Sequence, residues 1–226
     1  MAPIIRISDD QIGRAKKLLE SGQIDYDLVP EAQSSIPGFI YVPSINMDVA
    51  IEKTLHGKNW FESHIELQGN GFIMLPPFEF TKFLKYTRDN HQDIYKEITE
   101  VRSPLREEWL DANFKVRKDG QLYVYDKHVL NKDGKIISQR PPRLLQKNTL
   151  RQNRKISLEY WIRNSTGQGL PIENSKEGEM HYWAPMDDDK SVARFDVGPD
   201  GINFACSRIP SFKSPNIGVR AAKRRE

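Results

Sequence analysis

The sequence contains a single cysteine, Cys206, among its 226 residues. One cysteine forms no disulfide within the chain, and it excludes a zinc site built from several cysteines. Long hydrophobic runs are lacking as well, since no window approaches the apolar length that a membrane-spanning helix needs. The opening residues MAPIIRISDDQ have neither the basic start nor the long apolar run of a signal peptide. We therefore expect a cytoplasmic protein without a membrane span, although unconventional export to the cell surface would leave no mark in the sequence.

Sequence patterns of common catalytic and cofactor sites are lacking too. The five histidines are isolated, with no His-x-His or His-Glu-x-x-His spacing, and neither a Gly-x-Gly-x-x-Gly nor a Walker A sequence is present. No Gly-x-Ser-x-Gly sequence supports a serine nucleophile. Cys206 has two interpretations, a nucleophile or a small apolar group packed in a strand. On motifs alone we expect no catalysis, no cofactor and no metal site.

An acidic run at 187–189 lies within reach of His181, and histidine and aspartate together can bind a divalent ion. The run lacks the alternating ligands, central glycine and distal glutamate of an EF-hand. We favour a strand of surface aromatics, with Tyr182 and Trp183 beside His181, followed by an acidic turn. Whether calcium binds at this turn stays open at this point.

Positive and negative charges nearly balance, leaving a net charge of +3 at pH 7. The excess comes largely from the basic residues at 223–225 and from the Arg/Lys-rich stretch 140–155. Such a stretch suits contacts with nucleic-acid phosphates. Its charges are not interleaved with aromatic residues, as they are in a single-strand binding groove. We therefore favour a solvated connector at 140–155 and keep nucleic-acid binding as an alternative function.

Helix signals begin early in the sequence. Ser8 and Gln11 form a capping box that begins an amphipathic helix, and Gly22 stands where a glycine ends such a helix. The segments 38–44 and 48–55 then predict two short strands. These elements are expected to form the start of a helix-rich half.

A change from strand to helix periodicity follows between residues 69 and 90. An apolar strand at 71–75 leads into a helix that begins near Pro77, because proline is accepted in the first helical turn. The residues expected on the buried side of this helix are Phe80, Phe83, Leu84 and Thr87. A second helix is expected at about 91–102.

Hairpins dominate the second half of the sequence. The segments 113–125 and 128–138 each turn on Lys-Asp-Gly, and 191–208 turns on Gly-Pro-Asp-Gly, where glycine supplies the positive φ of the turn. The segment 178–185 predicts a strand, whereas 156–163 is either a strand or a short helix. The expected helices lie in the first half of the sequence and most of the strands in the second half. This order predicts an α+β fold with a small twisted antiparallel sheet.

Apolar residues continue almost to the last position of the sequence. They are Ile217, Val219, Ala221 and Ala222. Chain ends that fray are usually polar. We therefore expect 216–222 to form a strand that packs into the core.

The closing segment CSRIPSFKSPNIGVRAA resembles the end of formylglycine-generating-enzyme-like domains. Those domains finish on a Cys/Ala-x-Arg strand, a loop with Pro and Asn, and an Asn-[Ile/Leu]-Gly-Phe-Arg strand. Cys206-Ser207-Arg208 and Asn216-Ile217-Gly218-Val219-Arg220 stand at the matching places, with Val219 replacing the usual phenylalanine and a shorter loop. The segment FIMLPPFEF at 72–80 is similar to that family's Leu-Pro-Thr-x-x-Glu-Trp step from strand to helix.

The resemblance implies a C-type-lectin-like fold. The same ending occurs in the variable proteins of diversity-generating retroelements, whose C-terminal region is mutagenised to vary a binding surface. Formylglycine-generating enzymes use a pair of active-site cysteines, whereas this chain has Cys206 alone. The resemblance therefore implies a divergent variable protein that binds a ligand without catalysis. A formylglycine-generating-like oxidoreductase with a degenerate cysteine site is the alternative.

We expect one C-type-lectin-like domain over 1–226, with a helix-rich half at 1–112 and a hairpin-rich half at 113–226. The variable region is expected at about 178–216, where Tyr, Trp, Phe, Ser, Asp and Asn are frequent. The partner is expected to be a protein or another surface ligand. The ligand-binding positions that the resemblance implies are Tyr182, Trp183, Asp187, Asp188, Asp196, Asn203, Phe204, Cys206, Ser207, Ser211 and Phe212.

Overall fold

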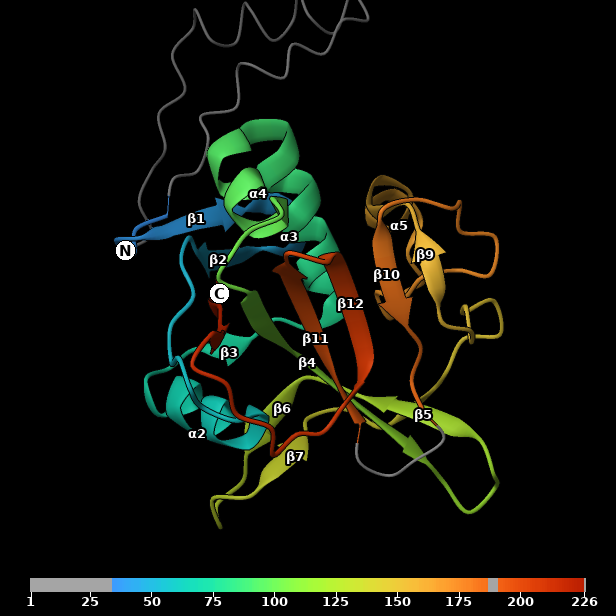
Figure 1. Cartoon of the computed structure of the whole chain (residues 1–226). Helices are drawn as coiled ribbons and strands as arrows, with labels where there is room; N and C mark the ends of the chain where they lie inside the picture. Colours follow the sequence, from blue (N-terminus) through green and yellow to red (C-terminus); the bar gives the residue numbers. More distant parts are fainter. Residues whose placement is uncertain (1–33, 187–190, 226) are drawn as a thin grey trace, which may run out of the picture. The chain divides into compact units, whose positions relative to one another are not determined.

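The computed structural model describes residues 34–186 and 191–225, which combine helices with several β-sheets (Figure 1). A four-stranded sheet has the order β1-β2-β14-β3, with β1 at Phe39–Val42, β2 at Met47–Ala50, β14 at Ala221–Arg224 and β3 at Ile73–Met74. An eight-stranded sheet has the order β8-β5-β4-β11-β12-β10-β9, and β13 pairs with β4 outside this path. Its strands are β4 (Arg106–Val116), β5 (Leu122–Tyr125), β8 (Arg143–Leu144), β9 (Arg154–Ile156), β10 (Met180–Trp183), β11 (Ser191–Gly198), β12 (Gly201–Arg208) and β13 (Ile217–Val219). A separate hairpin consists of β6 (His128–Leu130) and β7 (Ile136–Ser138).

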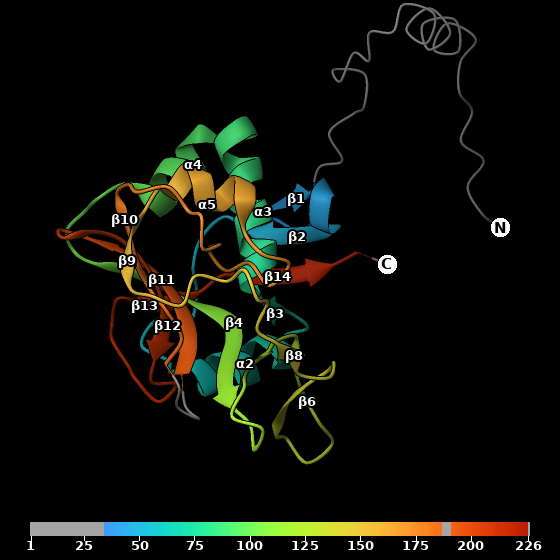
Figure 2. The ribbon, with the colours of Figure 1, turned by 90° about the vertical axis from the view of Figure 1, so that its right-hand side faces the viewer.

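Four α-helices lie in the described part of the chain. They are α2 (Trp60–Gly69), α3 (Pro77–Asn90), α4 (Gln92–Thr99) and α5 (Leu158–Asn164), and a short 3-10 helix, η2, covers Pro43–Ile45. Asn59 and Glu62 form a capping box at the start of α2, which satisfies backbone N–H groups there. Figures 1 and 2 show α3, α4 and α5 close together and α2 at the opposite end of the larger sheet.

The mixed helix-and-sheet class is confirmed, but the larger sheet differs from the expected small antiparallel one. It has eight strands, and it is mixed, because β10 pairs with β12 in parallel and β13 pairs with β4 in parallel. A helix, α5, also lies in the half expected to be rich in hairpins. The expected boundary between the helix-rich half and the hairpin-rich half, at residues 112 and 113, falls inside β4.

All three hairpins expected from their turn sequences are confirmed. β4 pairs with β5, β6 with β7, and β11 with β12, each antiparallel. Gly120, Gly134 and Gly201 have φ values of 72°, 71° and 111°, in the region where a side chain is disfavoured. The turn glycines therefore allow the chain to reverse at each hairpin.

The helices expected near Pro77 and at 91–102 are confirmed as α3 and α4, and the four residues expected on the buried side of α3 are buried. The ambiguous segment 156–163 ends β9 and then forms α5, whose N-cap Ser157 accepts a hydrogen bond from Tyr160 N. The helix expected to begin at Ser8 lies outside the described residues. The helix α2 is not among the elements predicted from the sequence.

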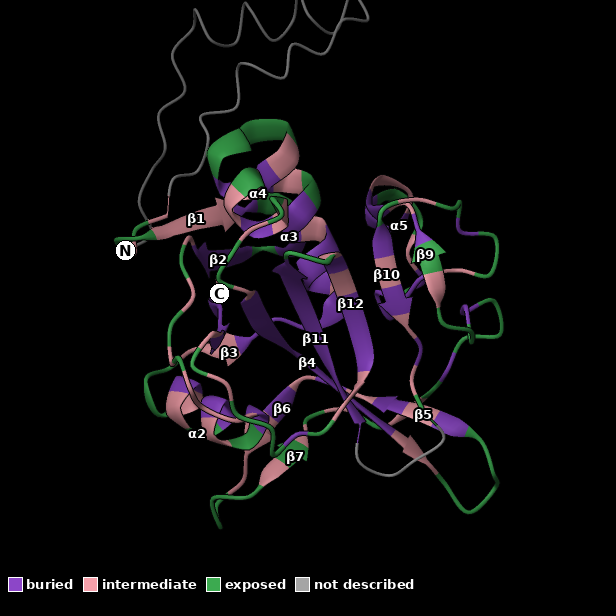
Figure 3. Cartoon of the chain, in the orientation of Figure 1, coloured by how far each residue is buried: buried purple, intermediate pink, exposed green. Residues whose placement is uncertain are grey.

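β4 is the central strand of the larger sheet. Its first half lies between β11 and β13, and its second half lies between β11 and β5. Figure 3 shows β4 and β11 buried along nearly their whole length, and every residue of β11 is buried. Polar residues on these two strands therefore need partners within the protein.

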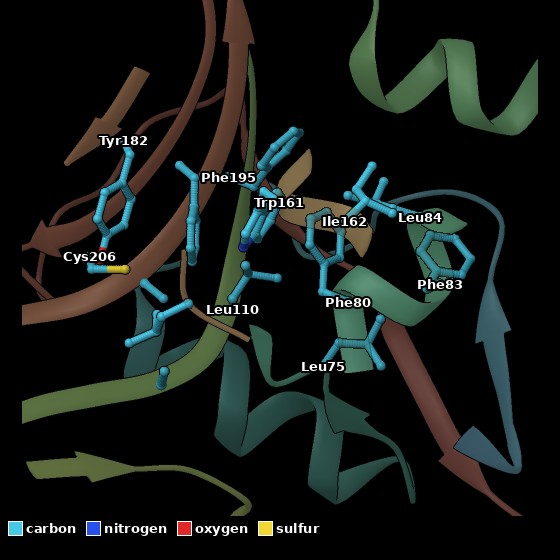
Figure 4. Close-up of a cluster of buried hydrophobic side chains, with 14 of the residues drawn as sticks. Leu75, Phe80, Phe83, Leu84, Leu110, Trp161, Ile162, Tyr182, Phe195 and Cys206 are labelled. Carbon is cyan, nitrogen blue, oxygen red and sulfur yellow. The ribbon is translucent and has the colours of Figure 1, made fainter. Parts of the chain in front are cut away.

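One face of the larger sheet packs against α3 and α5 to form the main core (Figure 4). Phe195 on β11 and Phe204 on β12 lie against the ring of Trp161 from α5, with ring centroids 6.2 and 4.6 Å apart. Phe80 of α3 contacts Phe195 at a centroid distance of 5.2 Å. These contacts fix the orientation of β11 and β12, and so determine which of their residues point away from the core.

The expectation of a packed final segment is confirmed, since Ile217, Val219, Ala221 and Ala222 are all buried. The segment forms two strands, because β13 joins β4 and β14 then enters the four-stranded sheet between β2 and β3. A Cβ atom at Gly218 would lie 2.8 Å from the Thr54 carbonyl oxygen, so the close approach of these two backbones requires glycine.

Among the residues that the structure describes, no helix has both the length and the apolar character needed to cross a bilayer.

Candidate functional site

Three of the residues expected to bind ligand form a hydrogen-bonded row across the larger sheet. The Nε1 of Trp183 on β10 donates to Asn203 Oδ1 on β12 at 3.2 Å. Asn203 Nδ2 in turn donates to Asp196 Oδ1 on β11 at 3.0 Å. Arg194 extends the row, because it pairs with Asp196 at 2.9 Å and also with Glu107 on β4. The sheet therefore brings residues from four strands into one polar network.

The polar network is buried at its Asp196 end and open at its Trp183 end. Asp196 is buried, and this burial raises its pKa, although Arg194 acts in the opposite direction. Trp183 and Asn203 are partly exposed, and His181 stacks on the Trp183 ring at a centroid distance of 4.2 Å. A ligand can therefore reach the Trp183 end, while the Asp196 end holds the network in place.

The expectation that Tyr182, Phe204 and Cys206 point outward is wrong. All three side chains have 0% exposure, and Figure 4 shows Tyr182 beside Cys206 in the core. Burial raises the pKa of both the Tyr182 hydroxyl and the Cys206 thiol. Alternation along a strand places Tyr182 and Trp183 on opposite faces, and Trp161 occupies the core face. The expected binding positions included neighbouring residues from both faces of the strand, and these cannot all lie on one ligand-binding surface.

The remaining expected positions lie on or after β12. Ser207 is partly exposed, and Ser211 and Phe212 are exposed in the loop that follows β12. Phe212 lies against Trp109, and the Arg194 guanidinium lies 5.7 Å from the centroid of the Phe212 ring. Asp187 and Asp188 lie outside the described residues. The 209–216 loop thus covers part of the sheet face that carries the polar network.

A cleft of about 630 Å³ opens beside Trp183. Its lining residues come from β10 and the residues after it, from the end of β12, and from the segment before β9. They are Arg151, Asn153, Trp183, Ala184, Pro185, Met186, Ser207 and Arg208. Asn153 Oδ1 accepts a hydrogen bond from Ala184 N at 2.8 Å, which holds two of these segments together. Two of the expected binding residues, Trp183 and Ser207, therefore line one concave surface.

Two arginines give the cleft a positive charge. Neither Arg151 nor Arg208 forms an ion pair with a residue in 34–186 or 191–225. Burial lowers the pKa of Arg208, and the neighbouring Arg194 lowers it further. Asp196 and Glu107 act on the pKa of Arg208 in the opposite direction, and an anionic group in the cleft could pair with either arginine directly.

The basic stretch at 140–155 contains residues that the fold itself uses. Arg140 and Arg143 both pair with the buried carboxylate of Asp126, and Arg154 donates to the backbone oxygen of Ser175. The Asp126 carboxylate thus fixes the connection between β7 and β8. These contacts agree with the interpretation of this stretch as a connector.

A second polar cluster lies in the interior, formed by residues far apart in sequence but close in space. His64 of α2, Asp111 of β4 and His128 of β6 each offer a ligand atom, and these atoms lie within 4.8 Å of one another. His128 Nδ1 hydrogen-bonds Asp111 Oδ1, and the His128 backbone N–H donates to Asp111 Oδ2 at 3.0 Å. The Trp60 ring lies against both imidazoles, at centroid distances of 4.2 and 5.0 Å.

The two histidines are isolated in the sequence, and the fold brings them together. Burial lowers the pKa of His64 and so favours its neutral form. Burial alone would raise the pKa of Asp111, but the two neighbouring histidines outweigh it and lower that pKa, so the carboxylate is ionised. Trp60, His64 and Leu67 lie on one face of α2, so a histidine within an apolar helical face was the signal available in the sequence.

We compared the chain with protein-family models, with curated proteins and with solved structures, and none of the three comparisons found a match. The function of the cleft is therefore inferred from its geometry and charge.

Proposed function

We propose that this protein binds a ligand without catalysis and that the cleft beside Trp183 is its recognition site. The ligand in this proposal is a protein surface that presents a carboxylate next to an apolar side chain. The observation that carries the proposal is the composition of the cleft of about 630 Å³, where an indole ring lies beside two arginines that have no ion-pair partner among the described residues.

The side chains around the cleft have the chemistry of a recognition surface. A tryptophan supplies rigid contact area, while serine and asparagine supply adaptable hydrogen bonds. Arginine binds a carboxylate through two parallel N–H donors. The hydrogen bond from Trp183 to Asn203 holds the indole in place before a ligand arrives, which lowers the entropic cost of binding.

The two faces of the larger sheet suit a surface that varies in sequence. Phe195 and Phe204 pack in the core, whereas Trp183, Asn203 and Ser207 are partly exposed, so these three side chains can change with little effect on the core. This separation supports our proposal of a retroelement-type variable protein with a C-type-lectin-like fold. The outward positions in this proposal are Trp183, Asn203, Ser207, Ser211 and Phe212, and the buried residues Tyr182, Asp196, Phe204 and Cys206 are not among them.

The two alternative functions receive less support. A buried thiol with a raised pKa makes Cys206 a poor nucleophile, which disfavours a formylglycine-generating-like oxidoreductase. Nucleic-acid binding through 140–155 would compete with the ion pairs that Arg140 and Arg143 form with Asp126. Ligand binding at the cleft needs no change in any of these contacts.

A displayed library of random peptides, selected for binding to the full chain, tests the proposal. Selected peptides should be rich in Asp or Glu next to an aromatic or aliphatic residue. Truncation of a central anchor typically costs about 2 kcal/mol, so Trp183→Ala and Arg208→Ala should each weaken binding of a selected peptide by about 30-fold. Fluorescence anisotropy of the labelled peptide measures this change.

Two substitutions outside the cleft serve as matched controls. Phe61→Ala removes an exposed aromatic ring on α2, and Arg117→Ala removes an arginine just after β4. Both should leave the dissociation constant unchanged. Selected peptides that bind Trp183→Ala and Arg208→Ala as tightly as the parent chain would refute the cleft as the recognition site.

Whether the binding surface is diversified is tested separately, by sequencing the DNA around the gene. A near-copy of the 3′ coding region, differing at adenines and lying beside a reverse transcriptase gene, is the expected arrangement. Adenine positions in the template should correspond to outward residues such as Trp183 and Ser207, and seldom to buried ones such as Phe204. If the DNA beside the coding region holds no such copy, the diversification part of the proposal is contradicted, and the protein would bind its ligand with a fixed sequence.

A further inference from the structure

We propose that His64, Asp111 and His128 bind one divalent transition-metal ion, with Zn²⁺ as the probe of choice. Two imidazole nitrogens and one carboxylate oxygen are a donor set that zinc accepts in proteins. Within residues 34–186 and 191–225, these three residues form the one group of three or more histidine, cysteine or acidic side chains with this spacing. The site lies apart from the cleft beside Trp183, so it is independent of the proposed function.

His64 gives the strongest indication that the cluster binds an ion. The residue is 1% exposed, yet neither of its ring nitrogens has a hydrogen-bond partner among the described residues. Its Nε2 lies 3.4 Å from Asp111 Oδ1 without forming a hydrogen bond. A buried polar side chain without a well-formed hydrogen bond is rare in folded proteins, and such a group commonly binds an ion or an ordered water.

One pair of donor atoms, on His64 and Asp111, has the spacing of two ligands of a tetrahedral ion. Zinc binds nitrogen and oxygen ligands at about 2.0–2.2 Å, so two ligands of one tetrahedral ion lie roughly 3.4 Å apart. The observed 3.4 Å between His64 Nε2 and Asp111 Oδ1 already has this value. His128 Nδ1 is hydrogen-bonded to the same oxygen, so these two groups would have to move apart for both to bind the ion.

The residues around the cluster hold the donor atoms in place. The Asp111 backbone N–H donates to Leu75 O at 2.8 Å, and Asp111 Oδ2 accepts the His128 backbone N–H, which leaves Oδ1 directed at the imidazoles. Gln68 of α2 donates to His128 O at 2.9 Å and accepts from Leu130 N at 2.6 Å. The helix and the β6 strand are thus tied together independently of the ion.

A fourth ligand can come from a small cavity that Asp111 and His128 also line. The cavity has a volume of about 100 Å³, and Glu79, Lys127 and Gln139 are among its other lining residues. A space of this size in a polar setting holds ordered water. Three protein ligands and one water would complete the tetrahedron and fasten α2 and β6 to β4. Calcium and magnesium are not expected here, because they prefer sets of oxygen ligands.

The test uses the full chain, freed of metal by a chelator and then titrated with Zn²⁺ against a competing chromophoric chelator. One Zn²⁺ per chain should bind, and binding should raise the melting temperature, because an ion that binds only the folded state stabilises it. Co²⁺ in place of Zn²⁺ should give the visible absorption bands of a tetrahedral site with nitrogen and oxygen ligands.

His64→Phe is the decisive variant. The phenyl ring occupies similar space beside Trp60, and it removes nitrogens that form no hydrogen bond with a described residue, so the variant should fold and melt near the metal-free parent. Its affinity for Zn²⁺ should fall by about 100-fold or more, since even outer-shell changes cost 10- to 100-fold. Asp111→Asn should lose binding as well, and circular dichroism checks that it folds.

His56→Phe is the matched control, because it removes a histidine outside the cluster and should leave Zn²⁺ binding unchanged. Two results would overturn the proposal. One is a parent chain that binds less than one Zn²⁺ and shows no change in melting temperature. The other is a His64→Phe variant that binds Zn²⁺ as tightly as the parent, which would assign the binding to other histidines.

Discussion

Arg220 and Glu108 form an ion pair in the interior that joins the C-terminal segment to the central strand β4. Arg220 Nε donates to Glu108 Oε1 at 3.1 Å, and the two side chains are 1% and 0% exposed. Burial alone would raise the pKa of Glu108, but Arg220 and Arg106 lower it by more, so the carboxylate is ionised. Arg220 also donates to the Ala50 carbonyl at 2.9 Å. The last residue of Asn-Ile-Gly-Val-Arg is therefore a structural anchor.

Arg220→Ala should lower the free energy of unfolding by about 3 kcal/mol or more, because it leaves a buried carboxylate short of one of its partners. Urea denaturation measures the change. The control is Arg163→Ala, which removes an i,i+4 pair with Glu159 on the surface of α5 and should cost less than about 0.5 kcal/mol. Equal effects of the two substitutions would contradict the anchoring role of Arg220.

Gly218→Ala should destabilise the protein by about 1–3 kcal/mol, as overpacking in a close contact usually does. The added Cβ would lie 2.8 Å from the Thr54 carbonyl oxygen. Gly69→Ala is the control, because a Cβ at this position in α2 meets no atom within 4 Å, and alanine favours helix. Thermal unfolding should therefore show a lower melting temperature for Gly218→Ala and an unchanged or higher one for Gly69→Ala.

Arg225→Ala should destabilise the protein at neutral pH and have little effect in acid. Arg225 donates to both carboxylate oxygens of Asp48, at 2.9 and 2.7 Å, and this contact lowers the Asp48 pKa from its ordinary 3.8. A lowered carboxyl pKa stabilises the folded state above the unfolded pKa, and this contribution is lost as pH falls through the folded value. The difference in unfolding free energy between the parent and the variant should therefore shrink below pH 3.8, to the part that comes from the contact of Arg225 with the Tyr41 ring. A difference that is independent of pH would contradict the ion pair.

Much of the local structure could be predicted from the sequence, because turn and cap residues determine it. The Lys-Asp-Gly turns specify two hairpins, and both glycines have the positive φ that the turns need. Pro77 and the spacing of Phe80, Phe83 and Leu84 specify the start and the buried side of α3. Asn59 and Glu62 form an equally clear capping box at α2. That signal was present in the sequence and was missed.

The arrangement of the sites could not be predicted, because it depends on which faces the fold covers. Alternation separates Tyr182 from Trp183 but does not say which of them faces the core, and β11 is buried on both faces. The position of Trp161 on α5 decides this, and that is a tertiary contact. The meeting of His64, Asp111 and His128 likewise depends on how α2 and β6 pack on β4.

The most direct test of recognition at the cleft is a substitution scan of 180–186 and 201–216, scored in parallel for folding and for binding of a selected peptide. Polar substitutions at Trp183, Ser207 and Arg208 should weaken binding while the melting temperature stays within a few degrees of the parent. Substitutions at Tyr182 and Phe204 should unfold the protein, since removal of a buried aromatic side chain costs about 3–5 kcal/mol. The proposal is contradicted if Trp183 and Ser207 reject polar residues as strongly as Phe204 does, or if their replacement leaves binding unchanged.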